Sequence, residues 1–147
     1  MPELARTLVS RLREFVGNRR RARRCPARLA FSVTPADRYV ISNGSRQRKW
    51  MEGHTFDVST SGLALVVPAI RIGEHYLVGD DRKLLLRLEL PTGTVEMQVA
   101  PVRYESLEEH PTEQGYVIGV RITDVDPQIK AGFESFVRRL LRSAPLD

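Results

Sequence analysis

Two neighbouring segments of alternating hydrophobicity constrain the fold of this chain more strongly than any other feature. Leucine occupies every second position from Leu84 to Leu90, and residues 94–100 alternate in the same way. The turn-forming residues Pro91, Thr92 and Gly93 separate the two segments. Because successive side chains of a strand point to opposite faces, each segment offers one apolar face to a core. The sequence therefore predicts a β-hairpin here, within an antiparallel sheet.

The chain between residues 29 and 123 has strand-like hydrophobic patterns throughout. Short apolar or alternating runs are separated by turn residues, which is typical of a β-barrel or β-sandwich. We expect strands over residues 29–34, 38–42, 48–51, 54–58, 62–67, 83–90, 94–104 and 115–123. Pro101 has no N–H to donate, so it indicates a bulge or a sheet edge. The predicted fold class is mainly β, a six- or seven-stranded antiparallel β-barrel.

The C-terminal segment changes to a helical period. Asp126 is suited to the N-cap and Pro127 to the first helical turn. Apolar side chains then recur on one helical face, at Ile129, Phe133, Phe136, Val137, Leu140 and Leu141. We expect a C-terminal α-helix that covers an open mouth of the barrel.

The first 28 residues differ from the rest of the chain in charge. They contain nine arginines and two glutamates, whereas residues 29–147 contain 14 basic and 16 acidic side chains, so the net charge of +5 originates in this segment. Residues 4–16 have the apolar stripe of a short amphipathic helix, and the arginine run after them has no apolar face. We therefore divide the chain into a helix with a basic arm, residues 1–28, and a barrel with a helix, residues 29–147. A basic arm favours a polyanionic partner.

Residue patterns of enzymes and metal proteins are absent from the sequence. Neither a nucleophile elbow of the G-x-S-x-G type nor a phosphate-binding glycine loop occurs, and the three histidines and one cysteine have no metal-ligand spacing. Cys25 has no histidine or second cysteine nearby, so we interpret it as an incidental thiol. The apolar runs are too short to cross a bilayer. We expect a cytoplasmic protein that is not an enzyme and has no cofactor.

Two motifs remain. Arg20 and Arg24 form R-x-x-x-R just before the first long strand, and Asp57, Ser59 and Gly62 form D-x-S-x-x-G just before the strand at 62–67. In this order, and followed by a barrel and a helix, they resemble the PilZ domain, a bacterial receptor module for cyclic di-GMP. The family pattern is R-x-x-x-R followed by [DN]-x-S-x-x-G. The resemblance covers residues 19–142.

The register of the first motif has to be chosen. Three arginine pairs have the required spacing: Arg19 with Arg23, Arg20 with Arg24, and Arg24 with Arg28. In the family, the second arginine is followed by a short approach to the first strand that contains a proline. Pro26 provides it after Arg24, so we favour Arg20 and Arg24.

The resemblance implies that cyclic di-GMP binds between the arginine arm and the turn. Arginine forks suit phosphate and the O6/N7 edge of guanine, and the Asp57 carboxylate suits the N–H donors of its other edge. Ser59 would add a hydroxyl contact, and Gly62 would permit a tight turn or close approach of a base. In the family, an arginine at the place of Arg19 is associated with two intercalated ligand molecules.

The resemblance also implies a signalling role. We expect the ligand to order the arm and so signal to a downstream protein partner. Two alternatives remain: a nucleic-acid-binding module that uses the basic arm, and an adaptor at a membrane surface that uses the arm together with the N-terminal helix. Without the upstream arginines, an ordinary β-turn without ligand contacts would be the preferred explanation of Asp57, Ser59 and Gly62.

Overall fold

The two alternating segments form the hairpin that the sequence predicts. In a computed structural model, which describes residues 23–37, 40–42, 45–107 and 115–143, strand β9 (Leu84–Leu90) pairs antiparallel with β10 (Gly93–Ser106). Leu84, Leu86 and Leu88 are fully buried, while Arg87 and Glu89 on the other face of the strand are exposed. The apolar face of the alternation is therefore the core face.

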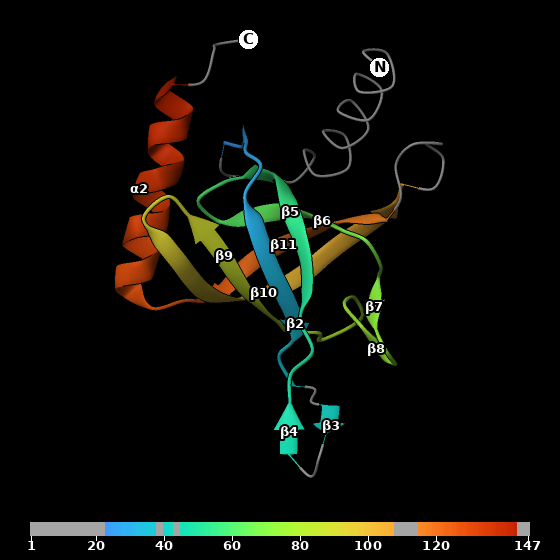
Figure 1. Cartoon of the computed structure of the whole chain (residues 1–147). Helices are drawn as coiled ribbons and strands as arrows, with labels where there is room; N and C mark the ends of the chain where they lie inside the picture. Colours follow the sequence, from blue (N-terminus) through green and yellow to red (C-terminus); the bar gives the residue numbers. More distant parts are fainter. Residues whose placement is uncertain (1–22, 38–39, 43–44, 108–114, 144–147) are drawn as a thin grey trace.

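Six strands close into an antiparallel barrel (Figure 1). Besides β9 and β10, this sheet contains β1 (Cys25–Pro26), β2 (Ala30–Pro35), β5 (Met51–Val58), β6 (Gly62–Val67) and β11 (Tyr116–Asp124). The order of the barrel strands is β5-β2-β9-β10-β11-β6, and β6 pairs back with β5. The seventh strand, β1, pairs with β5. The prediction of a mainly β fold with six or seven antiparallel strands is confirmed.

Two short hairpins lie outside the barrel sheet: β3 (Val40–Ser42) with β4 (Ser45–Gln47), and β7 (Arg71–Ile72) with β8 (His75–Tyr76). Figure 1 shows the β3–β4 hairpin projecting from one end of the barrel. The strand predicted over residues 48–51 is wrong, because β5 begins only at Met51. The Arg48 guanidinium donates to the carbonyls of Pro35 and Ala36 at 3.1 and 2.7 Å. Arg48 therefore links the segment before β5 to the end of β2 through its side chain.

The bulge indicated by Pro101 is present. The register between β10 and β11 shifts between Pro101 and Arg103, and β9 pairs with β10 only as far as Val99. Val102, at the bulge, is 51% exposed. Beyond this point β10 continues as a ladder with β11 alone to Ser106.

Helix α2 (Pro127–Ser143) begins as the sequence predicts. The Asp126 carboxylate accepts a hydrogen bond from the Gln128 amide at 2.9 Å, which is the geometry of an N-cap. Phe133 and Val137 from its apolar face are buried in the same cluster as the barrel leucines. The helix therefore completes the barrel core.

The predicted N-terminal helix and most of the basic arm, including Arg19 and Arg20, lie outside the described residues. No helix in the part of the chain that the structure describes is long and apolar enough to span a membrane.

Candidate functional site

Strand β1 joins the end of the basic arm to the barrel. Cys25 pairs with Val58 and Pro26 with Asp57, so the residues that follow the arginine run lie beside the strand that leads into the D-x-S-x-x-G turn. The Cys25 side chain is buried at 4% exposure. The sequence division placed residues 1–28 in the arm, whereas the structure includes Cys25–Pro26 in the sheet because this pairing and burial hold them there.

Backbone and hydroxyl contacts continue this attachment. The Ala27 amide donates to the Phe56 carbonyl at 3.2 Å, and the Leu29 amide donates to the Thr55 hydroxyl at 2.9 Å. The same Thr55 hydroxyl donates to the Ala27 carbonyl. Thr55 is only 1% exposed, so its hydroxyl bridges the arm and β5 from a buried position.

Arg24 and Asp57 are brought together by this pairing, although they are 33 positions apart in sequence. Nη1 of Arg24 lies 3.2 Å from Oδ1 of Asp57, and the side chains are 16% and 7% exposed. The Nε atom of Arg24 is buried and has no hydrogen-bond partner among the described residues. A buried donor without an acceptor costs about 1–3 kcal/mol, so an acceptor that reached this nitrogen would be stabilised there.

Ser59 closes the turn that follows Asp57. Its hydroxyl oxygen accepts from the amides of Gly62 and Ser61 at 3.1 and 3.3 Å and lies 3.2 Å from the Gly62 carbonyl oxygen, to which it donates. Its own amide donates to the same carbonyl at 2.8 Å. Because Ser59 is only 1% exposed and its hydroxyl is used within the turn, its observed role is to shape the turn.

Gly62 lies against the neighbouring strand β11. A Cβ atom at this position would be 2.4 Å from the Val120 carbonyl oxygen, which is far closer than side-chain atoms approach a backbone. Gly62 is therefore required by the contact between β6 and β11. The sequence suggested either a tight turn or close approach of a base, and the structure shows a close approach of backbone.

Cys25 adjoins the ion pair without the character of a reactive thiol. Burial raises the pKa of the Cys25 thiol above its usual range; the nearby Arg23 opposes this and Asp57 adds to it. The neutral thiol is therefore favoured, and a neutral thiol is a poor nucleophile. This agrees with the interpretation of Cys25 as an incidental thiol.

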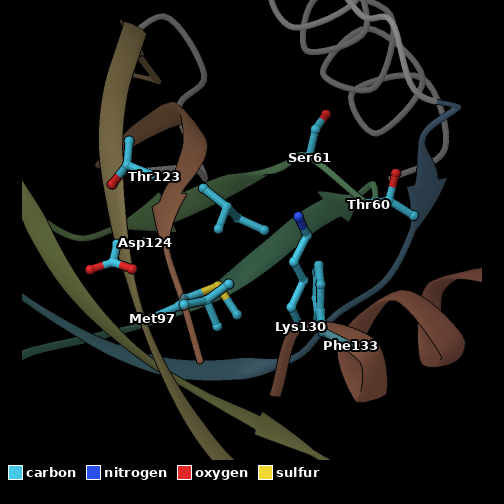
Figure 2. Close-up of a pocket in the computed structure, with 9 residues that line it drawn as sticks. Thr60, Ser61, Met97, Thr123, Asp124, Lys130 and Phe133 are labelled. Atoms are coloured by element: carbon cyan, nitrogen blue, oxygen red, sulfur yellow. The ribbon is translucent and has the colours of Figure 1, made fainter. Parts of the chain in front are cut away.

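A cavity of about 290 Å³ opens beside the turn (Figure 2). Thr60 and Ser61 line it from the turn, Thr123 and Asp124 from the end of β11, and Lys130 from α2. Sequence reasoning missed these residues. The available signal was weak: Thr60 and Ser61 occupy variable positions of the motif, and Lys130 is a polar residue on the exposed side of a helix. Within the described ranges, no group of three or more His, Cys, Asp or Glu side chains is placed to hold a metal ion.

The geometry is that of a small β-barrel with an arginine held at a strand turn, and sequence comparison assigns its class. The PilZ domain family profile matches residues 18–139, and the chain belongs to this family. No curated protein sequence matches the chain.

Solved structures with similar folds include PilZ domains. The Bacillus subtilis inhibitor of motility MotI/DgrA is similar at a TM-score of 0.59 and 16% identity, over 86% of this chain and 53% of the other, so this chain spans about half of that protein. The PilZ domain of YcgR from Escherichia coli, solved with c-di-GMP, is similar at a TM-score of 0.58 and 14% identity, over 85% of this chain and 93% of the other. The PilZ domain of CeSA from a cellulose-synthesizing bacterium is similar at a TM-score of 0.51 and 19% identity, over 81% of this chain and 98% of the other. At these identities the likeness concerns the fold.

Proposed function

We propose that this protein is a non-enzymatic receptor for cyclic di-GMP. The observation that carries the proposal is the contact between Arg24 and Asp57, which joins the two family motifs at one place on the barrel. Membership of the PilZ family and the similarity to a PilZ domain solved with c-di-GMP support the same ligand.

The arginines supply the chemistry for a dinucleotide with two phosphates. A planar guanidinium donates two parallel hydrogen bonds to a phosphate or to the O6/N7 edge of guanine, and it also stacks on a flat base. Arg24 is held beside the turn, where its Nε donor lacks an acceptor. In this proposal Arg20 contributes a second fork, and Arg19 a third that favours two ligand molecules per protein.

Asp57 and its turn supply recognition of the base. A carboxylate has about four lone-pair sites, so the Asp57 side chain that contacts Arg24 is also a suitable acceptor for the N1–H and N2–H donors of guanine. Ser59 holds the turn in shape, and Gly62 fixes it against β11. The proposal therefore gives Asp57 the base contact, with Ser59 and Gly62 as positioning residues.

Calorimetric titration tests the proposal. We expect saturable binding of cyclic di-GMP and none of GTP or cyclic AMP. Arg24→Ala should weaken binding about tenfold to a hundredfold, because it removes charge-assisted hydrogen bonds. Arg71→Ala is the matched control, since Arg71 is an exposed arginine of the outer β7–β8 hairpin. Absence of a saturable signal at high micromolar cyclic di-GMP would refute the receptor function.

Base recognition has its own test. Cyclic di-AMP lacks the N2 donor of guanine, so wild-type protein should prefer cyclic di-GMP, and Asp57→Asn should reduce that preference because an amide replaces one acceptor by a donor. Equal affinity of the wild-type protein for both dinucleotides would show that Asp57 does not read the base.

The proposed relay is that bound ligand fixes the arginine arm against the barrel and presents a changed surface to a downstream protein. Limited trypsin digestion measures this directly, because each arginine of the arm is a cleavage site. Saturating cyclic di-GMP should slow cleavage within residues 19–24 far more than cleavage at Arg46 and Arg48, which lie in and just after the β3–β4 hairpin. Equal rates with and without ligand would rule out the relay.

A further inference from the structure

The cavity beside the turn has rigid walls that belong to three elements. Thr60 and Ser61 come from the D-x-S-x-x-G turn, Asp124 from the end of β11 and Lys130 from the first turn of α2. The Ser61 carbonyl accepts a hydrogen bond from the Ile122 amide at 2.9 Å, which ties the turn to β11. Buried Phe133 anchors α2 in the core. The cavity is therefore preformed.

Its polar groups lie on opposite sides. Figure 2 shows the Lys130 side chain pointing toward Thr60 and Ser61, while Asp124 lies across the cavity from it. Neither Lys130 nor Asp124 forms an ion pair with another residue in the described ranges. Met97 and Phe133 provide an apolar floor between them. The cavity thus offers a cation, an acceptor and apolar lining atoms at three separate places.

We propose that this cavity is a further subsite for the ligand, in which one purine base lies on the floor, Asp124 accepts from the base and Lys130 contacts the attached phosphate. This inference rests on the proposed function. The volume of about 290 Å³ is at the lower limit of small-molecule pockets, so it suits a single base and not a whole dinucleotide. Apolar floors with a few oriented polar groups are typical of such sites.

The subsite gives α2 a direct contact with the ligand. Lys130 is three residues from Phe133, which is 1% exposed within the core. A ligand contact with Lys130 is therefore made to a helix that is packed against the barrel. The terminal helix then belongs to the receptor site, together with the arm.

Charge-matched variants test the role of Lys130. Lys130→Gln keeps most of the side-chain length and removes the charge, and Arg139→Gln removes one charge from an exposed position of the same helix outside the cavity. In calorimetric titration with cyclic di-GMP at low salt, Lys130→Gln should weaken binding about tenfold, and Arg139→Gln should stay within about twofold of wild type. The difference should shrink as salt is added, because the contact is ionic and accessible to solvent.

The role of Asp124 is tested by base discrimination. Asp124→Asn should reduce the preference for cyclic di-GMP over cyclic di-AMP, whereas Glu89→Gln, at an exposed position of β9, should not. If Lys130→Gln and Arg139→Gln bound cyclic di-GMP with equal affinity, or if Asp124→Asn left the preference for cyclic di-GMP over cyclic di-AMP unchanged, the subsite would be overturned. The receptor function would still be supported in that case, provided that the wild-type protein binds cyclic di-GMP. Failure of the wild-type protein to bind cyclic di-GMP would overturn both.

Discussion

The ion pair between Arg24 and Asp57 should stabilise the folded protein even without ligand. Both partners are largely buried, at 16% and 7% exposure, and the charged atoms are 3.2 Å apart. Two unit charges about 4 Å apart attract by about 4 kcal/mol at an effective dielectric of 20. Desolvation opposes much of this gain. We therefore expect a net coupling energy of about 1–2 kcal/mol, above the range of about 0–1 kcal/mol for exposed pairs.

A double-mutant cycle measures this coupling. The free energy of unfolding in urea is determined for wild type, Arg24→Ala, Asp57→Ala and the double variant. The chain offers a matched control in Arg87 and Glu96, whose charged atoms are 3.3 Å apart but whose side chains are 51% and 49% exposed. The control cycle should give a smaller coupling, because solvent screens that pair. A coupling energy for Arg24 and Asp57 no larger than that of the control pair would refute this reasoning. It would also refute the idea that this pair anchors the arm to the barrel.

Three further predictions concern the same region. Arg24→Lys should restore little of the cyclic di-GMP affinity lost in Arg24→Ala, because lysine keeps the charge and lacks the planar fork; full rescue in calorimetry would contradict bidentate binding. Gly62→Ala should lower the melting temperature by roughly 3–12 °C, because its Cβ would be 2.4 Å from the Val120 carbonyl oxygen, whereas Gly132→Ala on α2, with nothing within 4 Å, should not lower it. The raised pKa of Cys25 means that the folded state holds the thiol proton more tightly than the unfolded state. Stability should thus fall as pH rises past about 8.5, and urea titrations at increasing pH should show a smaller fall in Cys25→Ala.

The regular part of the fold could be predicted from local pattern. The strand at Gly62–Val67 and the helix that begins at Pro127 after the Asp126 cap were located from hydrophobic period and capping residues alone. Four strands of two or three residues, β1, β4, β7 and β8, were not found in this way. Strand β1 has only two residues, and it exists because it pairs with β5, more than thirty positions away.

The candidate site likewise has features that the sequence predicts and features that only the tertiary structure shows. Spacing and the family resemblance pointed to Arg24 and Asp57, but only the pairing of β1 with β5 shows that they touch. Ser59 was expected to contact ligand, and the structure shows its hydroxyl within the turn. Lys130 escaped notice because it is some seventy residues from Ser61, and a lysine on a helix face indicates solvent exposure until the tertiary structure places it at a cavity.

The most direct test of the receptor site is to follow backbone amide resonances during titration with cyclic di-GMP. The proposed function predicts that the largest shifts occur in residues 23–26 and 57–62, which form the Arg24–Asp57 contact and the turn, while the outer hairpin of β7 and β8 stays unchanged. Shifts confined to that outer hairpin, or no shifts at saturating ligand, would contradict it.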